Sequence, residues 1–305
     1  MTVGRGGAVS AVVFAALLWG TTGTVATFFP DEVTPIAIGA VTMGAGGLLL
    51  FATAPRLSVG VLREPRARRW VIVGAVGVFI YPLAFYSGME LAGVAIGNVV
   101  ALGTGPVVTA LCEWLFERQP LSRRWAVSTA LAVAGVALLS FGRHADDGGN
   151  DIVAGVLLGL LAGVAYGLYT YASSRAIGFG HPSRGVMGAM FGCGALLLLP
   201  VLVATGGPIL ADPTSVGLAA YLALGPMFLA YLLVGVALRS LRSSTVTTVA
   251  LIEPIAATVL AVAVVGERLE PIAWIGIGVI MAGIVVLVTA RPPRIQTRAP
   301  LDSEP

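Results

Sequence analysis

The sequence predicts an all-α polytopic membrane protein of ten transmembrane helices, arranged as two inverted five-helix repeats. Three observations lead to this fold class. Hydrophobic residues make up 57% of the 305 residues and charged residues only 11%, so there are too few polar residues to cover a soluble globule. Long charge-free stretches recur along the chain, and the two halves share motifs at a constant spacing.

The charge-free stretches give the individual helices. A helix that crosses a bilayer needs about 20 mostly apolar residues. Ten stretches of about this length follow one another, and one of them is interrupted only by Glu253. They cover residues 6–30, 33–55, 70–89, 91–112, 125–142, 152–174, 185–211, 213–238, 243–266 and 271–290. The first is longer than the apolar core of a typical signal peptide, so we expect it to be a retained helix.

The arginines test the helix count and give an orientation. With ten helices and the N-terminus inside, sixteen of the eighteen arginines fall on the inner side, and only Arg143 and Arg268 fall outside. Cytoplasmic loops of membrane proteins carry such an excess of basic residues. One missed or invented helix would reverse every later loop. We therefore expect a multi-pass protein of a bacterial inner membrane, with both termini in the cytoplasm.

The internal repeat spans half of the chain. Pro106 and Pro254 lie 148 residues apart, and so do Gly135 and Gly283. Five helices per repeat is an odd number, so the second copy enters the membrane inverted relative to the first. Many transporters have inverted repeats with the binding site between the halves, near the membrane centre. We expect a first repeat over 1–146 and a second over 147–305, the latter with a short cytoplasmic tail.

At this point the chain resembles the drug/metabolite transporter superfamily, in particular its EamA-type branch of ten-helix transporters. The resemblance is carried by Leu18-Trp19-Gly20, by Pro106 with Glu117-Arg118, and by Glu253-Pro254 with Gly266-Glu267-Arg268. It covers nearly the whole chain. The first half departs from the pattern, with Phe116 where Gly often precedes the Glu and Gly105 opposite Glu253. The resemblance implies transport, often export, of small organic metabolites, without fixing the substrate.

The composition argues against several other functions. The chain has no lysine, so it cannot carry a Walker A phosphate site or a pyridoxal Schiff base. Two histidines and two cysteines are too few for a zinc site or a disulfide framework. The net charge of +3 comes from arginines scattered between apolar segments, not gathered on one face for nucleic acid. We therefore expect no cofactor, no metal and no nucleic-acid partner. The expected partners are a small-molecule substrate, the lipid bilayer and protons as coupling ion, and the oligomeric state stays open.

Glu253 is the carboxylate at the centre of a predicted span. Burying it there is expensive, by roughly 2.5–3.5 kcal/mol on insertion scales, so it needs a function or a partner. It either couples transport to protons or binds a substrate amine, or it hydrogen-bonds to a neighbouring helix. Pro254 and Pro106 each remove a helix donor at equivalent places in the repeats. We expect these kinks to form the site, since interrupted helices often do.

Further candidates are polar or aromatic side chains inside predicted spans. Asn98 either binds substrate or joins two helices. Buried Trp and Tyr need a partner for their N–H or O–H, which favours a position facing the central pathway, although packing is the alternative for each of them. The aromatic candidates are Trp19, Tyr81, Tyr86, Tyr166, Tyr169 and Tyr231. The predicted helices that carry these candidates, the first, third, fourth, sixth, eighth and ninth, would line the pathway.

Other features favour a structural interpretation. Gly155, Gly159, Gly163 and Gly167 recur every four residues and predict a groove for close helix packing. Glu113 and Glu117 precede Arg118, Arg123 and Arg124, which predicts a charge-paired helix end at the membrane surface. Three tryptophans lie at the starts of predicted helices, which is typical of side chains that anchor a helix at the membrane surface. They are Trp70, Trp125 and Trp274.

The function that these observations favour is secondary active transport of small organic metabolites by alternating access, with export favoured. Amino acids, amines and aromatic compounds suit the candidate residues. A metabolite importer or exchanger of the same fold is the alternative. An intramembrane enzyme is a third reading, but no nucleophile elbow is present and both histidines fall in predicted loops. A passive helper or receptor-like membrane protein is a fourth.

Overall fold

The computed structural model describes residues 4–92, 94–141, 151–265 and 270–289, which form helices and connections and no strand. The first half contains α1 (Arg5–Ala26), α2 (Pro35–Ala52), α3 (Pro55–Arg63), α4 (Pro65–Ala92), α5 (Val94–Glu117) and α6 (Arg123–Phe141). The second half contains α7 (Ile152–Gly178), α8 (Ser183–Thr205), α9 (Gly207–Ala211), α10 (Pro213–Leu222), α11 (Ala230–Ala237), α12 (Ser243–Val249), α13 (Glu253–Leu260) and α14 (Pro271–Val288).

The second half also contains three irregular helical segments. A π-helical segment, Ala223–Leu229, joins α10 to α11. A 3₁₀ turn, Ala250–Ile252, joins α12 to α13, and π-helical residues Ala261–Val265 follow α13. α10–α11 and α12–α13 therefore each form one long interrupted helix.

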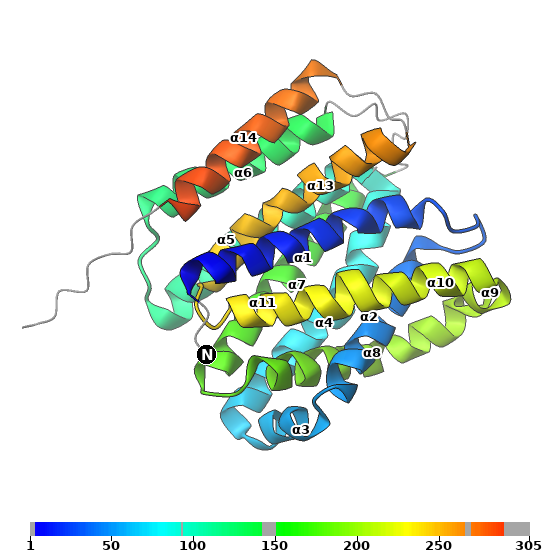
Figure 1. The fold of residues 1–305 in the computed structure, drawn as a ribbon, viewed down its shortest axis with the longest axis horizontal. Coiled ribbons are helices and arrows are strands. Elements are labelled where there is room, and N and C mark those ends of the chain that lie inside the picture. The colour runs from blue at the N-terminus through cyan, green and yellow to red at the C-terminus, as the bar shows by residue number, and fades with distance from the viewer. Residues whose placement is uncertain (1–3, 93, 142–150, 266–269, 290–305) are drawn as a thin grey trace, which may run out of the picture.

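The helices have the lengths and compositions of membrane spans. In the described parts of the chain, eight helices are long and apolar enough to cross a membrane, with α10–α11 and α12–α13 each counted as one. Residues 271–287 form a shorter apolar helix. α6, which corresponds to the fifth predicted span, is a 19-residue helix that packs along α14 at one edge of the molecule (Figure 1). The ten predicted spans are thus all helical, in the predicted order. The main hydrophobic core lies between α1, α4, α7, α8 and α11, and a smaller one joins α6 to α14.

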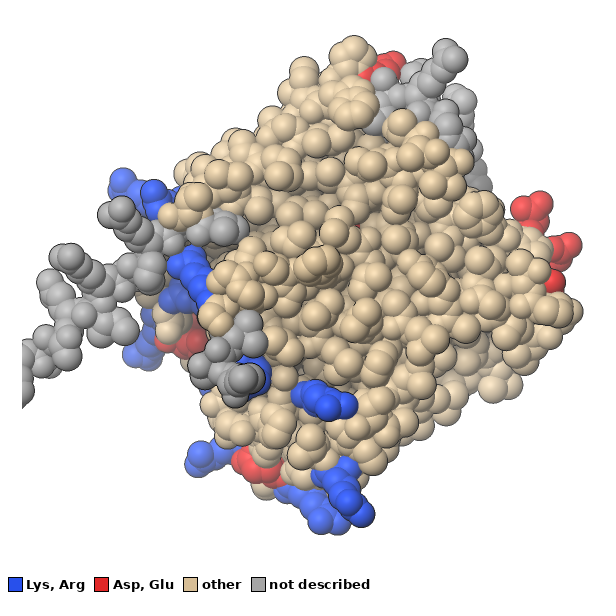
Figure 2. All heavy atoms as spheres, viewed as in Figure 1, with Lys and Arg blue, Asp and Glu red and all other residues tan. Residues whose placement is uncertain are grey.

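The charged residues lie at the two ends of the bundle. Figure 2 shows the arginines on one side of the molecule, with some acidic residues among them, further acidic residues on other sides, and a broad uncharged surface in the middle. Each described arginine lies at a helix end or connection that faces the first of these ends, here named the arginine-rich end. Arg143 and Arg268, predicted for the other side, lie outside the described residues.

The helix contacts follow the inverted repeat. α2 packs on α8, and α6 packs on α14. α4 and α5 both pack on α7, while α11 and α13 both pack on α1. Each helix of the first repeat has an equivalent in the second: α1 and α7, α2 and α8, α4 and α10–α11, α5 and α12–α13, and α6 and α14. When each helix is replaced by its equivalent, every one of these contacts becomes another contact of the set or stays the same. The two repeats therefore pack as structural equivalents. The predicted division at 146 and 147 falls outside the described residues and stays a prediction.

The arginine-rich stretch before the third span is helical, whereas the sequence predicted only a connection there. Helix α4 begins at Pro65, ahead of the predicted 70. The Glu64 carboxylate accepts the backbone N–H groups of Arg66 and Ala67, at 3.2 and 2.8 Å, and so satisfies free donors of the first turn. The hydrogen bond from Ala67 is the largest cause that lowers the pKa of Glu64. A search for charge-free stretches cannot find such a helix start.

The glycine stripe of α7 is a close-packing surface, as predicted. A Cβ atom on Gly155 would lie 2.4 Å from the Cβ of Ala92. A Cβ atom on Gly163 would lie 2.5 Å from the Cβ of Thr104, and one on Gly167 would lie 2.6 Å from the Cβ of Val108. Side chains are therefore excluded where α7 meets α4 and α5.

Gly163→Ala is expected to destabilise the protein by about 1–3 kcal/mol, because the added methyl group has no room between α7 and α5. Gly278→Ala in α14 is the matched control, since no atom lies within 4 Å of the Cβ position there. Thermal unfolding in one fixed detergent measures both variants. Equal unfolding temperatures for the two would contradict the packing account.

Candidate functional site

Most of the predicted aromatic residues meet in the middle of the bundle. The ring centroid of Trp19 lies 5.2 Å from that of Tyr231, and Tyr231 lies 6.1 Å from Tyr169. Tyr81 lies 5.9 Å from both Tyr166 and Tyr169. The rings come from α1 and α4 of the first half and from α7 and α11 of the second half. The structure therefore brings side chains of both repeats into one cluster.

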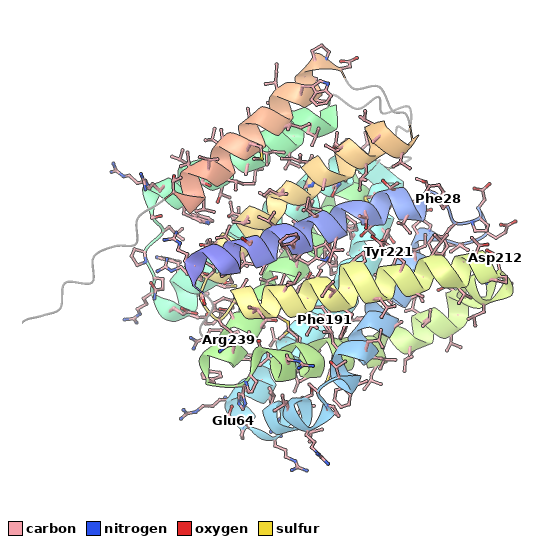
Figure 3. The ribbon with its side chains drawn as sticks, in the orientation of Figure 1. Phe28, Glu64, Phe191, Asp212, Tyr221 and Arg239 are labelled. Atoms are coloured by element: carbon pink, nitrogen blue, oxygen red, sulfur yellow. The ribbon has the colours of Figure 1, made fainter. Side chains whose placement is uncertain are left out.

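Phe191 of α8 completes this group, and the sequence analysis missed it. Its ring centroid lies 4.3 Å from that of Tyr231 and 5.6 Å from that of Tyr169. Figure 3 shows Phe191 between the end that carries Glu64 and Arg239 and the end that carries Phe28 and Asp212. A phenylalanine in an apolar helix has no polar group to mark it in the sequence. We name Trp19, Tyr81, Tyr166, Tyr169, Phe191 and Tyr231 the aromatic cluster.

Trp19 is held in place by contacts on both sides of it. Its indole Nε1–H donates to the backbone carbonyl of Pro226 at 2.8 Å. Pro226 lies in the π-helical segment between α10 and α11, where the irregular backbone leaves carbonyls free to accept. The next residue, Gly20, lets α1 approach α13, because a Cβ there would lie 2.5 Å from the Cβ of Ala256. Trp19 therefore lies where α1 meets both interrupted helices.

Two tyrosines of the cluster are joined by a hydrogen bond. The hydroxyl groups of Tyr169 and Tyr231 lie 2.6 Å apart, and both side chains are buried. Tyr166 packs beside them, with its ring against the backbone of Gly105, where a Cβ would lie 2.4 Å from Tyr166 Cδ1. The first-half residue that stands opposite Glu253 in the repeat is thus a glycine that makes room for a ring.

Tyr169→Phe and Tyr231→Phe are each expected to lower stability by about 0.6–1.5 kcal/mol, because each removes one intramembrane hydrogen bond. Both changes delete the same bond, so the double variant should lose little more than either single one. Unfolding measurements on the three variants test this expectation. Additive losses would show that the two hydroxyl groups do not depend on each other.

Glu253 begins α13, directly after the 3₁₀ turn. It is half-buried at the middle of its span, and its helix packs on α1, which carries Trp19. Within the described parts of the chain, no hydrogen bond or ion pair reaches its carboxylate. All described arginines lie at the arginine-rich end. Among these described residues, no neighbouring helix supplies the hydrogen bond that was the structural alternative for Glu253.

The two candidate prolines differ in their local structure. The helix changes to a 3₁₀ turn that ends at Ile252, two residues before Pro254, as expected for an interrupted span. Helix α5 continues through Pro106 without a break, so the expectation of equivalent interruptions in both halves was wrong at Pro106. The Thr109 hydroxyl lies beside this residue and donates towards the carbonyls of Gly105 and Pro106, at 3.1 and 2.9 Å. α5 is therefore a regular span opposite an interrupted one.

Tyr86 and Asn98 lie towards the end opposite the arginines. Tyr86 packs its ring against α2, where a Cβ on Gly39 would lie 2.6 Å from Tyr86 Cε2. Phe85 links it to the aromatic cluster, at 5.5 Å from Tyr86 and 5.3 Å from Tyr81. Asn98 follows the start of α5, and its buried Oδ1 has no hydrogen-bond partner in the described structure. These two residues are peripheral to the cluster.

The arginine-rich end is tied together across the two halves by Glu113. Its carboxylate accepts the hydroxyl groups of Ser243 and Ser244, each at 2.7 Å, and the backbone N–H of Ser244 at 2.9 Å. All three residues are buried. The expected pairing of Glu113 with nearby arginines was therefore wrong, because Glu113 points across to the start of α12. We name Glu113, Ser243 and Ser244 the Glu113 cluster.

Further contacts join the halves at the same end. Arg175 pairs with Glu117 at 3.4 Å, and His181 lies 3.4 Å from Glu64. Arg242 donates to the side chain of Gln119, and Trp125 donates to the Ser244 carbonyl at 3.4 Å. At the opposite end, the bond between Thr21 and Tyr221, at 2.9 Å, crosses between the halves.

The threonines of α12 also join helices. The hydroxyl groups of Thr247 and Thr109 lie 3.0 Å apart, and so do those of Thr248 and Thr129. Both α12 threonines are buried. These bonds connect α12 to α5 and α6. The two threonine hydroxyl groups thus serve to hold neighbouring helices together.

The middle of the bundle thus holds aromatic side chains from both halves and, at the start of α13, a carboxylate that no described cation neutralises. Within the residues that the structure describes, no three His, Cys, Asp or Glu side chains gather to hold a metal ion.

Comparison with known proteins agrees with this arrangement of two packed repeats. The EamA-like transporter family matches the chain twice, over residues 6–141 and 153–289. The chain belongs to the EamA-like transporter family. Each match covers one half of the bundle, from α1 to α6 and from α7 to α14.

Individual relatives of this EamA-like chain are also transporters by name. The chain is 34% identical to the transporter YwfM of Bacillus subtilis, over 94% of this chain and 95% of that protein. It is 26% identical to the inner membrane transporter YedA of Escherichia coli, over 90% and 88%. It is 31% identical to the threonine/homoserine exporter RhtA of Escherichia coli, over 66% and 68%.

A solved structure shares the fold of the EamA-like chain. That crystal structure has a TM-score of 0.75 and 23% sequence identity, and it covers 93% of this chain and 96% of its own chain.

Proposed function

We propose that this EamA-like chain exports small organic metabolites by proton-coupled alternating access, with Glu253 and the aromatic cluster as the binding site. The observation that carries the proposal is the uncompensated Glu253 carboxylate on α13, a helix that packs on α1 where Trp19 joins the aromatic side chains of both repeats. A carboxylate in a membrane is retained at a cost, so it favours a functional role. The family and the names of the relatives support transport, and RhtA is named as an exporter.

The substrate side of the proposal rests on the same residues. An unpaired carboxylate attracts an ammonium group, and tyrosine and tryptophan faces favour cations and aromatic rings. Amino acids, amines and aromatic compounds therefore fit the site. The Glu253 carboxylate binds either a proton or an ammonium group, but not both at once. A proton that enters the site from outside the cell would therefore displace the substrate to the outside. The inward proton gradient would in this way drive export.

The orientation follows from the charge distribution. We infer that the arginine-rich end faces the cytoplasm of a bacterial cell and that both termini lie there, because basic residues concentrate on that side. The relative YedA is named an inner membrane transporter, which supports the same membrane for this chain. The Glu113 cluster would then close the cytoplasmic side.

Transport into inverted membrane vesicles tests the direction and the driving force. Vesicles from cells that make the chain should accumulate a substrate from a panel of threonine, homoserine, aromatic amino acids and amines when their interior is acidified. A protonophore should abolish the accumulation. Proton-driven accumulation only in right-side-out vesicles would contradict export and favour the importer of the same fold.

A further inference from the structure

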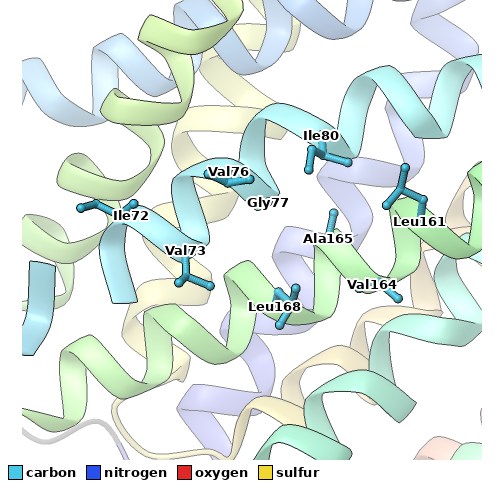
Figure 4. Close-up of a pocket in the computed structure, with 9 residues that line it drawn as sticks. All are labelled: Ile72, Val73, Val76, Gly77, Ile80, Leu161, Val164, Ala165 and Leu168. Atoms are coloured by element: carbon cyan, nitrogen blue, oxygen red, sulfur yellow. The ribbon is translucent and has the colours of Figure 1, made fainter. Parts of the chain in front are cut away.

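A groove on the outside of the bundle lies between α4 and α7. It has a volume of about 280 Å³, and nine residues line it: Ile72, Val73, Val76, Gly77, Ile80, Leu161, Val164, Ala165 and Leu168 (Figure 4). Its walls are exposed, with Ile72 53% and Val76 45% accessible. Its floor is the contact between the helices, because a Cβ on Gly77 would lie 2.9 Å from the Ala165 carbonyl oxygen.

The groove is aligned with an arginine at its end. Arg69 precedes Ile72, Val73, Val76 and Ile80 by three, four, seven and eleven residues, so all five lie on one face of α4. Helical side chains lean towards the N-terminus of their helix, and arginine extends its charge towards the membrane surface. Arg69 therefore stands above the groove at the arginine-rich end, with the exposed Arg68 beside it.

The charges around this point favour an anionic group. No ion pair joins Arg68 or Arg69 to a carboxylate in the described structure. Arg175 reaches the same level from α7, because its guanidinium lies over the Trp70 ring, but Glu117 already pairs with it. Glu64, the other nearby carboxylate, accepts backbone donors of α4 and lies beside His181. Arg68 and Arg69 thus remain available to a ligand.

The length of the groove matches one leaflet of a bilayer. From Arg69 to Ile80, α4 rises about 16 Å at ~1.5 Å per residue. Half of a hydrocarbon core of roughly 30 Å is about 15 Å. An acyl chain whose headgroup lies at Arg69 would therefore follow the apolar wall to its end, near the membrane centre.

We propose that this groove binds an anionic phospholipid from the leaflet at the arginine-rich end. One acyl chain lies along the nine apolar residues, and Arg68 and Arg69 hold the phosphate. A second copy of this chain is a less suitable occupant, because a standard protein interface buries about 800 Å² on each partner and carries hydrogen bonds. The groove is narrow, and apolar side chains line it throughout.

Native mass spectrometry of the delipidated full chain tests the proposal. The probes are phosphatidylglycerol and phosphatidylcholine with identical acyl chains. The wild type should retain phosphatidylglycerol at least threefold more than phosphatidylcholine as its first bound lipid. Arg68→Gln with Arg69→Gln should remove this preference, and Val76→Trp, which fills the groove from a lipid-exposed position, should reduce binding of the first phosphatidylglycerol several-fold.

Two control variants make the same chemical changes elsewhere at this end. Arg56→Gln with Arg63→Gln removes two exposed charges from α3, and Val127→Trp enlarges an exposed residue of α6. Both should bind lipid as the wild type does. Equal losses in the control and test variants would overturn the proposal, as would the absence of any headgroup preference. A change of the dimer fraction by Val76→Trp would overturn it in favour of contact between copies.

Discussion

Glu253→Gln is expected to abolish uphill transport, with at least a tenfold fall in accumulation, while substrate exchange continues. Glutamine keeps the shape of the side chain and its place at the start of α13. It cannot bind and release a proton, so the proton gradient no longer drives the cycle. Exchange of substrate for substrate needs no net proton movement, and the aromatic cluster still binds the substrate when the ammonium contact to Glu253 is lost.

The measurement compares two assays on the same inverted vesicles. One follows accumulation of substrate against its gradient, and the other follows exchange of labelled for unlabelled substrate. Glu90→Gln is the matched control, because Glu90 is an exposed carboxylate near the end of α4. Normal accumulation by Glu253→Gln would remove the coupling role. Loss of exchange together with accumulation would contradict this expectation and show that the aromatic cluster does not bind the substrate without the Glu253 carboxylate.

Glu113→Ala is expected to open the arginine-rich end of the bundle. The change deletes the acceptor of three hydrogen bonds from Ser243 and Ser244 across the two halves. At about 1 kcal/mol net for each bond, the closed arrangement loses about 3 kcal/mol relative to an open one, which is on the order of a hundredfold in population. The repeat does not place a second carboxylate at the position equivalent to Glu113, since the residue 148 positions later is Ala261.

The native Cys112 provides the readout for this opening. It is 8% exposed and lies next to Glu113. In a Cys193→Ala background it is the single remaining thiol, because the chain has two cysteines. Its labelling by a maleimide should accelerate strongly in Glu113→Ala. Glu113→Gln, which keeps one acceptor oxygen, should give an intermediate rate.

Ser243→Ala with Ser244→Ala is the second arm of this test. It removes both hydroxyl donors and leaves Glu113 in place, so it should also accelerate Cys112 labelling. Wild-type labelling rates in folded Glu113→Ala and in the serine variant would show that other contacts close this end.

The sequence alone was sufficient to locate the helical segments and the aromatic residues that meet between them, because both depend on composition along single helices. Span length, arginine placement and the 148-residue repeat all follow from the requirement that a chain in lipid be helical and apolar. Tyr169 and Tyr231 were predicted from the need of a buried hydroxyl for a partner, and they became partners of each other. Whether these residues bind substrate stays a prediction.

Contacts between distant helices could not be read in the same way. Glu113 lies near three arginines in the sequence, but helix packing directs it to serines of the other half. Phe191 and the Pro226 carbonyl cannot be told from other parts of apolar helices until α8 and the π-helical segment Ala223–Leu229 pack against the cluster. The effect of Pro106 on its helix could not be predicted from the sequence either, because a proline does not interrupt every helix that contains it.

The central claim is tested most directly by the metabolites that cells release. The growth medium of cells that make the wild type is compared with that of cells that make Glu253→Gln at an equal level, and with that of cells that make neither. The account predicts a metabolite, an amine or an amino acid, that accumulates outside only with the wild type. Equal accumulation with both proteins would contradict the role of Glu253, and three indistinguishable media would contradict export.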